Sequence, residues 1–272
     1  MTGQKSILRQ TAIQIIATVA STSLLWPFFA TAMTTASKVF TTPQVIALAE
    51  AVQAGDTAQI TSLIRAGADI RAVGAQGLTI THFALLARRD APKIMVLVLK
   101  AGADPISVLS DGNTVPIYAV QRDDADPEVV KVLLDHGIGV NWHPPKEPFD
   151  RTSLLLEAVA GHNLPVVKLL IQRGADVNWS DGFGGTALHS ALLGAQFDIA
   201  ALLVDSGTDL ALLNNTSPLI KNPNLKKETA LQVFCRKEGG RRGASPLPQV
   251  ASGWAHLQAA LARRGTKMPC EL

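Results

Sequence analysis

Apolar side chains along this chain recur at helical spacing, in pairs of short stretches. Residues 186–193 predict a short helix, and residues 197–206 predict a second one after a glycine break. The apolar face of the second helix is made of Ile199, Leu202 and Leu203. Gly207 follows where a helix end needs a left-handed residue. This segment therefore predicts a helix–turn–helix unit.

The tripeptide Gly-Ala-Asp, or a degenerate copy of it, follows each second helix of this kind. The copies begin at Gly67, Gly102, Gly137, Gly174 and Gly207, at intervals of 35, 35, 37 and 33 residues. A fixed period in this range is typical of a repeat array, in which each unit buries its apolar face against its neighbours. Such arrays are more often extended binding surfaces than enzymes.

The beginning of the chain predicts export. Lys5 and Arg9 precede an apolar stretch that carries no charge until Lys38. Ala30-Thr31-Ala32 supplies the small-residue pattern that a signal peptidase recognises. An uncleaved anchor is the alternative, because about 20 apolar residues suffice to span a bilayer. Either reading places the rest of the chain in the periplasm.

The domain organisation expected from these patterns has three parts. Residues 1–32 are the signal peptide, cleaved after Ala32, or an inner-membrane anchor. Residues 33–42 are a linker, and residues 43–272 are the repeat domain, with an atypical capping unit over 228–272.

The basic balance of the chain is not evidence for nucleic-acid binding. The formal charge is +3, and removal of Lys5 and Arg9 leaves 23 basic against 22 acidic residues. Residues 33–209 carry a net charge of −6 and residues 210–272 a net charge of +7. The basic end could steer a partner or could simply be solvated.

The motifs resemble those of the ankyrin repeat family. Thr186-Ala187-Leu188-His189 is similar to the family's Thr-Pro-Leu-His, and Gly174-Ala175-Asp176-Val177-Asn178 is similar to its repeat ending. The resemblance covers residues 43 to about 265 and implies an all-α solenoid of about six helix-turn-helix units with β-turn fingers. In the fourth unit either Thr152 or Ser153 could take the threonine position.

The resemblance places several side chains on the fingers between units, where partners bind. Trp142 and Trp179 occupy equivalent positions, and large amphipathic rings are enriched at interface hot spots. The partner-binding residues predicted are Trp142, His143, Trp179, Asp181, Phe183, Arg241 and Arg242. Alternatively, both indoles pack on their longer, proline-rich finger and on each other.

No catalytic, metal or cofactor site is expected. His82 and His189 match the family's histidine, which makes a structural hydrogen bond across the turn. The chain shows no metal-ligand spacing, nucleophile elbow or phosphate loop.

The two cysteines predict a disulfide in an oxidising compartment. A bond between Cys235 and Cys270 would pin the tail to the last unit and contribute roughly 3–4 kcal/mol. The alternative is a buried Cys235 and a free tail thiol.

The resemblance to exported bacterial ankyrin proteins implies a protein partner. We expect an immunity protein that sequesters a type VI secretion effector, such as a periplasmic lipase or phospholipase. A periplasmic scaffold or stress-protection partner is the alternative, and an enzyme in the C-terminal unit is a third reading. The expected protein is a monomer before complex formation, binds no nucleic acid, and meets the membrane only through an uncleaved N-terminus.

Overall fold

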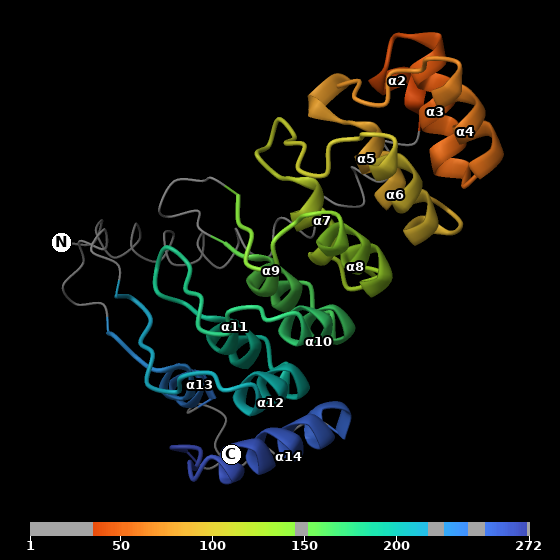
Figure 1. Ribbon diagram of the computed structural model, residues 1–272. Coiled ribbons are helices and arrows are strands. Elements are labelled where there is room, and N and C mark those ends of the chain that lie inside the picture. The colour runs from red at the N-terminus through yellow and green to blue at the C-terminus, as the bar shows by residue number, and fades with distance from the viewer. Residues whose placement is uncertain (1–34, 145–151, 217–225, 239–247, 271–272) are drawn as a thin grey trace, which may run out of the picture.

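A computed structural model describes residues 35–144, 152–216, 226–238 and 248–270. These residues form helices that stack side by side into an elongated, slanting array (Figure 1). The expected signal peptide or anchor, residues 1–32, and the expected binding residues Arg241 and Arg242 lie outside the described residues. Of the described helices, none is both long and apolar enough to span a bilayer.

Six helix pairs make up the array in the described part of the chain. Their first helices are α3 (Pro43–Ala54), α5 (Ile80–Leu85), α7 (Val115–Val120), α9 (Leu154–Ala160), α11 (Ala187–Leu193) and α13 (Ala230–Glu238). Their second helices, called the outer helices below, are α4 (Thr57–Arg65), α6 (Ala91–Lys100), α8 (Pro127–Asp135), α10 (Leu164–Gln172), α12 (Phe197–Asp205) and α14 (Pro248–Arg263). The all-α solenoid of about six units is confirmed.

The fingers lie on the side of the array opposite the outer helices (Figure 1). Among the described residues the only β-pairing is four isolated bridges, one in each of four fingers. The bridges join Val73 to Thr79, Val108 to Thr114, Ser180 to Thr186 and Leu213 to Thr229. In each of these four fingers the bridge thus ends at the threonine that directly precedes the next unit's first helix.

One continuous hydrophobic core runs through all six units. It extends from Ala36 to Leu261, and it includes the faces that adjacent helix pairs turn toward one another. Leu48, Ile94, Leu170 and similar side chains are fully buried between units. Because burial is continuous, the units stabilise one another as a solenoid should.

Glycines close the outer helices in the left-handed conformation that the repeat motif predicts. Gly67, Gly102, Gly137, Gly174 and Gly207 have φ values between +86° and +100°. At Gly67, Gly137, Gly174 and Gly207 no described atom lies within 4 Å of the position that a Cβ would take. Backbone conformation, and not crowding, therefore favours glycine at these four sites.

Both ends of the array differ from its inner units. Residues 36–40 are not a linker, since α2 (Ala36–Val39) packs on α3 and buries Ala36 and Val39. Phe40 is buried as well, and its ring lies 5.6 Å from that of Phe83 on α5, in the second unit. At the other end, the last helix, α14, extends from Pro248 to Arg263. Each of these segments covers an end of the core that has no further unit to pack on.

The fourth unit begins at Ser153, which settles the choice between Thr152 and Ser153. Ser153 is the N-cap of α9, where its Oγ accepts a hydrogen bond from the Leu156 N–H at 3.2 Å. Thr152 instead donates its hydroxyl to Glu157 at 2.8 Å.

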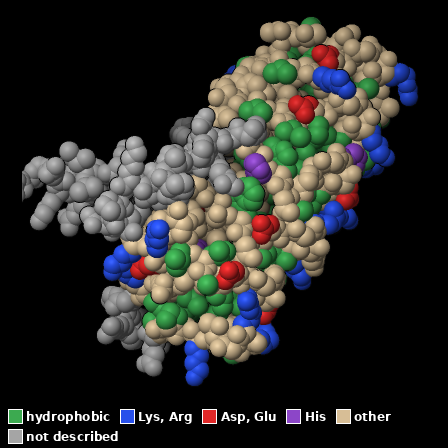
Figure 2. Space-filling view, turned by 60° about the vertical axis from the view of Figure 1, so that its left-hand side comes forward, with side chains coloured by type: hydrophobic (Ala, Val, Ile, Leu, Met, Phe, Trp, Pro, Cys, Tyr) green, Lys and Arg blue, Asp and Glu red, His purple; other side chains and the backbone are tan. Residues whose placement is uncertain are grey.

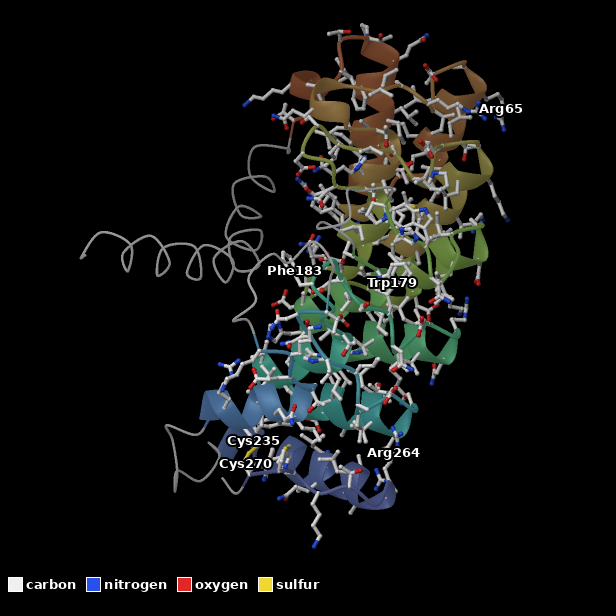
Figure 3. The ribbon with its side chains drawn as sticks, turned by 90° about the vertical axis from the view of Figure 1, so that its left-hand side faces the viewer. Arg65, Trp179, Phe183, Cys235, Arg264 and Cys270 are labelled. Atoms are coloured by element: carbon white, nitrogen blue, oxygen red, sulfur yellow. A yellow bond between two sulfur atoms is a disulfide. The ribbon has the colours of Figure 1, made fainter. Side chains whose placement is uncertain are left out.

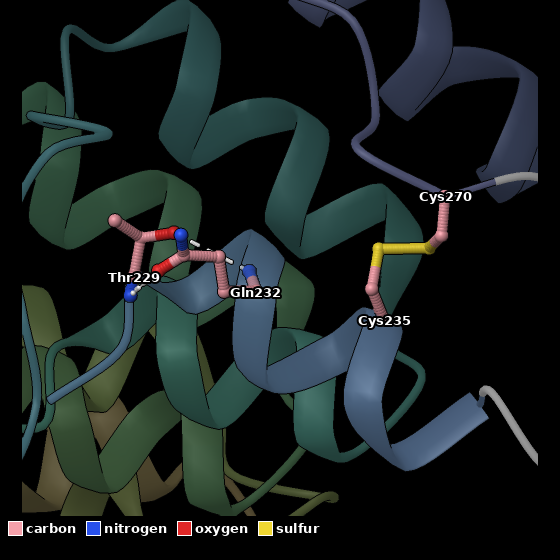
Figure 4. The surroundings of a disulfide bond; sticks show 4 residues. All are labelled: Thr229, Gln232, Cys235 and Cys270. Carbon is pink, nitrogen blue, oxygen red and sulfur yellow. Dashed lines mark hydrogen bonds between the residues drawn. A yellow bond between two sulfur atoms is a disulfide. The ribbon is translucent and has the colours of Figure 1, made fainter. Parts of the chain in front are cut away.

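The last unit carries a disulfide between Cys235 on α13 and Cys270 in the tail (Figure 4). Their Cα atoms lie 5.6 Å apart. Thr229 and Gln232 cap the start of the same helix, with the Thr229 N–H donating to Gln232 Oε1 at 2.9 Å. The disulfide thus joins the tail to a helix that packs on α11.

Gly137→Ala should lower the free energy of unfolding by about 1–2 kcal/mol, because alanine is strained in the left-handed region. Gly137→Asn should cost less, since asparagine tolerates that conformation better. Gly139→Ala in the same motif is the control, because Gly139 lacks a positive φ and its Cβ would lie 4.0 Å from the nearest atom. Urea denaturation measures all three, and equal losses at the two positions would contradict the assignment.

Replacing both cysteines by serine should lower stability by roughly 3–4 kcal/mol, the loop-entropy value for a loop of this length. The unreduced wild-type protein should also have the mass of a chain that has lost its two thiol hydrogens. Mass spectrometry with and without reductant checks the bond independently of the denaturation curve. An unreduced mass equal to the reduced mass would show two free thiols.

Candidate partner-binding site

Four of the fingers begin at an aspartate in the third position of the Gly-Ala-Asp motif or its copy, and the finger after Gly137 has Gly139 there instead. Asp69, Asp104, Asp176 and Asp209 accept a hydrogen bond through Oδ1 from the backbone N–H two residues later, each at 2.9 Å. This local bond turns the chain away from the helix end and into the finger. The motif therefore supports the backbone of the finger. The side chains further along the finger can differ from one unit to the next.

Two asparagines tie neighbouring fingers together. Asn141 Oδ1 accepts from the Asp176 N–H at 2.8 Å, and Asn178 Oδ1 accepts from the Asp209 N–H at 2.8 Å. Each asparagine directly precedes one of the predicted tryptophans, Trp142 and Trp179. The backbone next to each indole is thus hydrogen-bonded to the following finger.

The two indoles are half-buried and pack against the hydrophobic core. His143 is exposed, and its ring lies over Trp179 with the centroids 4.8 Å apart. The structure therefore brings His143 and Trp179 together from consecutive fingers. The packing of the rings agrees partly with the alternative reading, because each indole serves the frame as well as the surface.

Phe183 is also exposed, with 36% of its surface accessible. Asp181 Oδ1 accepts from the Phe183 N–H at 2.8 Å and from the Gly185 N–H at 2.7 Å. Asp181 therefore shapes the fingertip that presents Phe183. Figure 3 shows Phe183 and Trp179 on the face that carries the fingers.

Three exposed aliphatic residues at the β-bridges of the fingers escaped the sequence reasoning. Val73, Val108 and Leu213 are 71%, 53% and 37% exposed, and each is the bridge partner of the threonine that begins the next unit. Hydrophobic side chains accordingly occur at intervals along the array in Figure 2. Val73 and Val108 lie six residues before Thr79 and Thr114, and this offset is the signal that could have revealed them.

The two motif histidines make the hydrogen bonds that a structural role requires. His82 Nδ1 accepts from the Thr79 N–H, and His189 Nδ1 accepts from the Thr186 N–H, both at 3.2 Å. His189 Nε2 also lies 3.3 Å from the Glu228 carbonyl oxygen. Burial lowers the pKa of both imidazoles, that of His82 to about 4. A neutral ring is what these hydrogen bonds need.

The described side chains offer no obvious metal centre. No group of three or more His, Cys, Asp or Glu residues among them is placed to hold an ion.

Comparison with known proteins identifies several similar chains. A family model described as ankyrin repeats in three copies matches residues 126–214. Protein PhlB of Serratia liquefaciens is 31% identical over 188 residues, which are 69% of this chain and 79% of PhlB. A putative ankyrin repeat protein of Rickettsia bellii is 34% identical over 103 residues, 30% of this chain and 43% of that protein. The putative ankyrin repeat protein FPV034 of fowlpox virus is 30% identical over 110 residues, 40% of this chain and 24% of the viral protein.

A solved structure gives the same picture of the fold. The crystal structure of EF0377, an ankyrin repeat protein, matches with a TM-score of 0.57 and 21% identity. The match covers 82% of this chain and 99% of that one. By contrast, this chain spans less than half the length of the Rickettsia and fowlpox virus relatives.

His82→Gln should make the free energy of unfolding depend less on pH between about pH 7 and pH 4. The folded pKa of about 4 lies below the ordinary histidine value of 6.5, so the unfolded chain binds the proton first as pH falls. Stability should drop from near pH 7 to near pH 4, by up to about 3 kcal/mol, and the His82 contribution should level off below that. Glutamine keeps the cap bond, as Gln232 does for Thr229, without titrating.

The difference between the two proteins isolates His82, since His189 titrates in both. Urea denaturation at a series of pH values measures it. Parallel curves for wild type and variant would show that the buried ring does not carry this dependence.

Proposed function

Because this chain belongs to the ankyrin repeat family, we propose that it is a protein-binding module and not an enzyme, and that it holds its partner on the fingers. We further propose that it is exported and acts as an immunity protein. Its partner would be a type VI secretion effector that reaches the periplasm, such as a lipase or phospholipase. Occlusion of the effector's active site or membrane-insertion surface would neutralise it.

The observation that carries the binding role is the exposed apolar series Val73, Val108, Phe183 and Leu213 on a rigid frame. Isolated apolar side chains are ordinary on a surface, but these four occupy four different fingers on one side of the array. A few side chains that become buried in an interface supply most of its free energy, and large aromatic rings are enriched among them. The series therefore supports a contact surface.

The extent of this series favours a folded protein partner over a short peptide. Val73 and Val108 come from consecutive fingers, and Leu213 comes from a finger three units further along. With helices packed about 8–10 Å apart, a footprint of this kind is on the order of 35 Å long. A surface of that length suits an interface of standard size, about 800 Å² on each partner.

A prearranged frame also lowers the entropic cost of binding. The asparagine and aspartate hydrogen bonds fix the finger backbone before a partner arrives. Less conformational freedom is then lost on association, which favours high affinity. Tight sequestration is what neutralisation of a toxin requires.

Two observations support export. The apolar segment before residue 33 has the charge pattern and the Ala30-Thr31-Ala32 site of a secretory signal. The bond between Cys235 and Cys270 suits an oxidising compartment, where such disulfides persist. The choice of a lipase as the effector rests on the resemblance to exported bacterial ankyrin proteins.

Phe183→Ser should weaken capture of a type VI lipase effector at least tenfold, since truncating an interface anchor costs about 2 kcal/mol or more. Leu164→Ser is the matched control: Leu164 is 38% exposed, close to Phe183, but begins the outer helix α10. Binding of the purified effector to immobilised protein measures both. Equal affinities for the two variants would remove the fingers from the site.

Co-expression separates the immunity role from protein binding in general. Cells that carry a periplasm-directed lipase effector should survive with the full chain and die when residues 1–32 are deleted. Death in both cases, with capture of another exported protein intact, would reject immunity and favour a periplasmic scaffold.

A further inference from the structure

Negative charge on the finger side of the array is concentrated in two fingers. The second finger (residues 102–114) and the fourth (residues 174–186) each contain two aspartates and no lysine or arginine. The other three fingers, residues 67–79, 137–152 and 207–229, hold at least as many basic residues as acidic ones. A partner of complementary charge would therefore be attracted mainly to the second and fourth fingers.

In each of these two fingers an aspartate lies beside an exposed hydrophobic residue. Asp104 Oδ1 accepts a hydrogen bond from the Ile106 N–H at 2.9 Å, and Asp181 Oδ1 accepts one from the Phe183 N–H at 2.8 Å. Ile106 and Phe183 are 37% and 36% exposed. The hydrogen bond thus fixes a carboxylate next to the residue that bears the apolar side chain. In Figure 2, which brings the finger side forward, acidic side chains likewise lie among hydrophobic ones.

Neither of these carboxylates has a cationic partner. Among the described residues no ion pair includes Asp104 or Asp181. Arg71 extends from the first finger toward the second, but its Nε donates to the Gly102 carbonyl oxygen at 2.9 Å. Arg71 is thus held by the backbone at the base of the second finger and not by Asp104.

Carboxylates on the outer helices differ, because each of them contacts a basic side chain. The pairs are Glu128 with Lys131, Asp135 with Arg173, Asp198 with His256, and Asp205 with Arg263, at distances of 2.7–3.1 Å. The chain therefore supplies counter-charges to its outer-helix carboxylates, and supplies none to Asp104 and Asp181 within the residues that the structure describes.

A long basic side chain matches a carboxylate beside an apolar surface. Lysine and arginine pack their apolar stems on hydrophobic groups while the charged head stays at a polar one, and a cation also binds to the face of an aromatic ring. We propose that the second and fourth fingers each bind a lysine or arginine side chain of the protein partner. Its stem would lie on Ile106 or Phe183, and its charged head would meet Asp104 or Asp181.

This inference rests on the proposed function, since it takes the fingers as the place where the partner binds. It adds that the partner surface covered by the fingers is basic. The second and fourth fingers are two units apart, which is about 16–20 Å when helices pack 8–10 Å apart. On a helix, eleven residues make just over three turns and rise about 16 Å, so basic residues at this spacing would reach both fingers.

The test uses a fluorescent helical peptide with arginines eleven residues apart and leucines between them, titrated with the full chain in a fluorescence anisotropy assay. Asp104→Asn/Asp181→Asn should weaken binding about tenfold, the combined effect of two partly exposed ion pairs. Asparagine keeps the oxygen that accepts the backbone hydrogen bond, so this change removes the charge without removing the turn. Asp135→Asn/Asp205→Asn removes the same charge from the outer helices and should leave binding within about twofold.

Absence of peptide binding by the wild-type chain, or equal affinity of the Asp104→Asn/Asp181→Asn and control variants, would overturn the proposal. The purified type VI lipase effector forms the second arm. Capture of the effector that is lost in Phe183→Ser but retained in Asp104→Asn/Asp181→Asn would keep the fingers as the site and overturn the basic side chains. Peptide binding that depends on the two aspartates, without capture of the effector, would support the two sites and reject only the effector as partner.

Discussion

Burial of apolar surface between adjacent units is the constraint on which the rest of this structure depends. A single pair of short helices cannot enclose its own apolar face, so each unit is stable only against its neighbours. Leu48, Ile94 and Leu170 are fully buried in this way in three different units. The residues that place each pair in register, among them the left-handed glycines and the threonine–histidine caps, recur for the same reason.

The same constraint explains the two ends of the array, where a core face has no further unit to cover it. At the start, α2 and Phe40 cover the first pair. At the other end α14 is longer than the other outer helices, and Trp254 packs with Phe197 and Phe234 at centroid distances of 5.1 and 5.8 Å. The disulfide then fastens the tail to α13. The ends of the array are thus stabilised by additional contacts and a disulfide, whereas the inner units are stabilised by their neighbours on both sides.

Local chemistry decides which parts of the fold can be predicted from the sequence. The helix expected over residues 197–206 ends within one residue of α12, because apolar spacing and Gly207 both act within the segment. The burial of Ala36, Val39 and Phe40 could not be predicted, since it depends on the surface of the helix pairs that follow them. The half-burial of Trp142 and Trp179 likewise depends on core residues distant in sequence, and the exposure of Val73 depends on which way its bridge turns the side chain.

A packed frame and the side chains that it displays have separate roles in this protein. Hydrogen–deuterium exchange of the full chain, with and without a saturating type VI lipase effector, tests this separation most directly. Amides of the fingers around Val73, Val108, Phe183 and Leu213 should exchange more slowly in the complex, while those of α8 and α10 keep their rates. Unchanged exchange in all four fingers, with protection confined to α8 and α10, would contradict it.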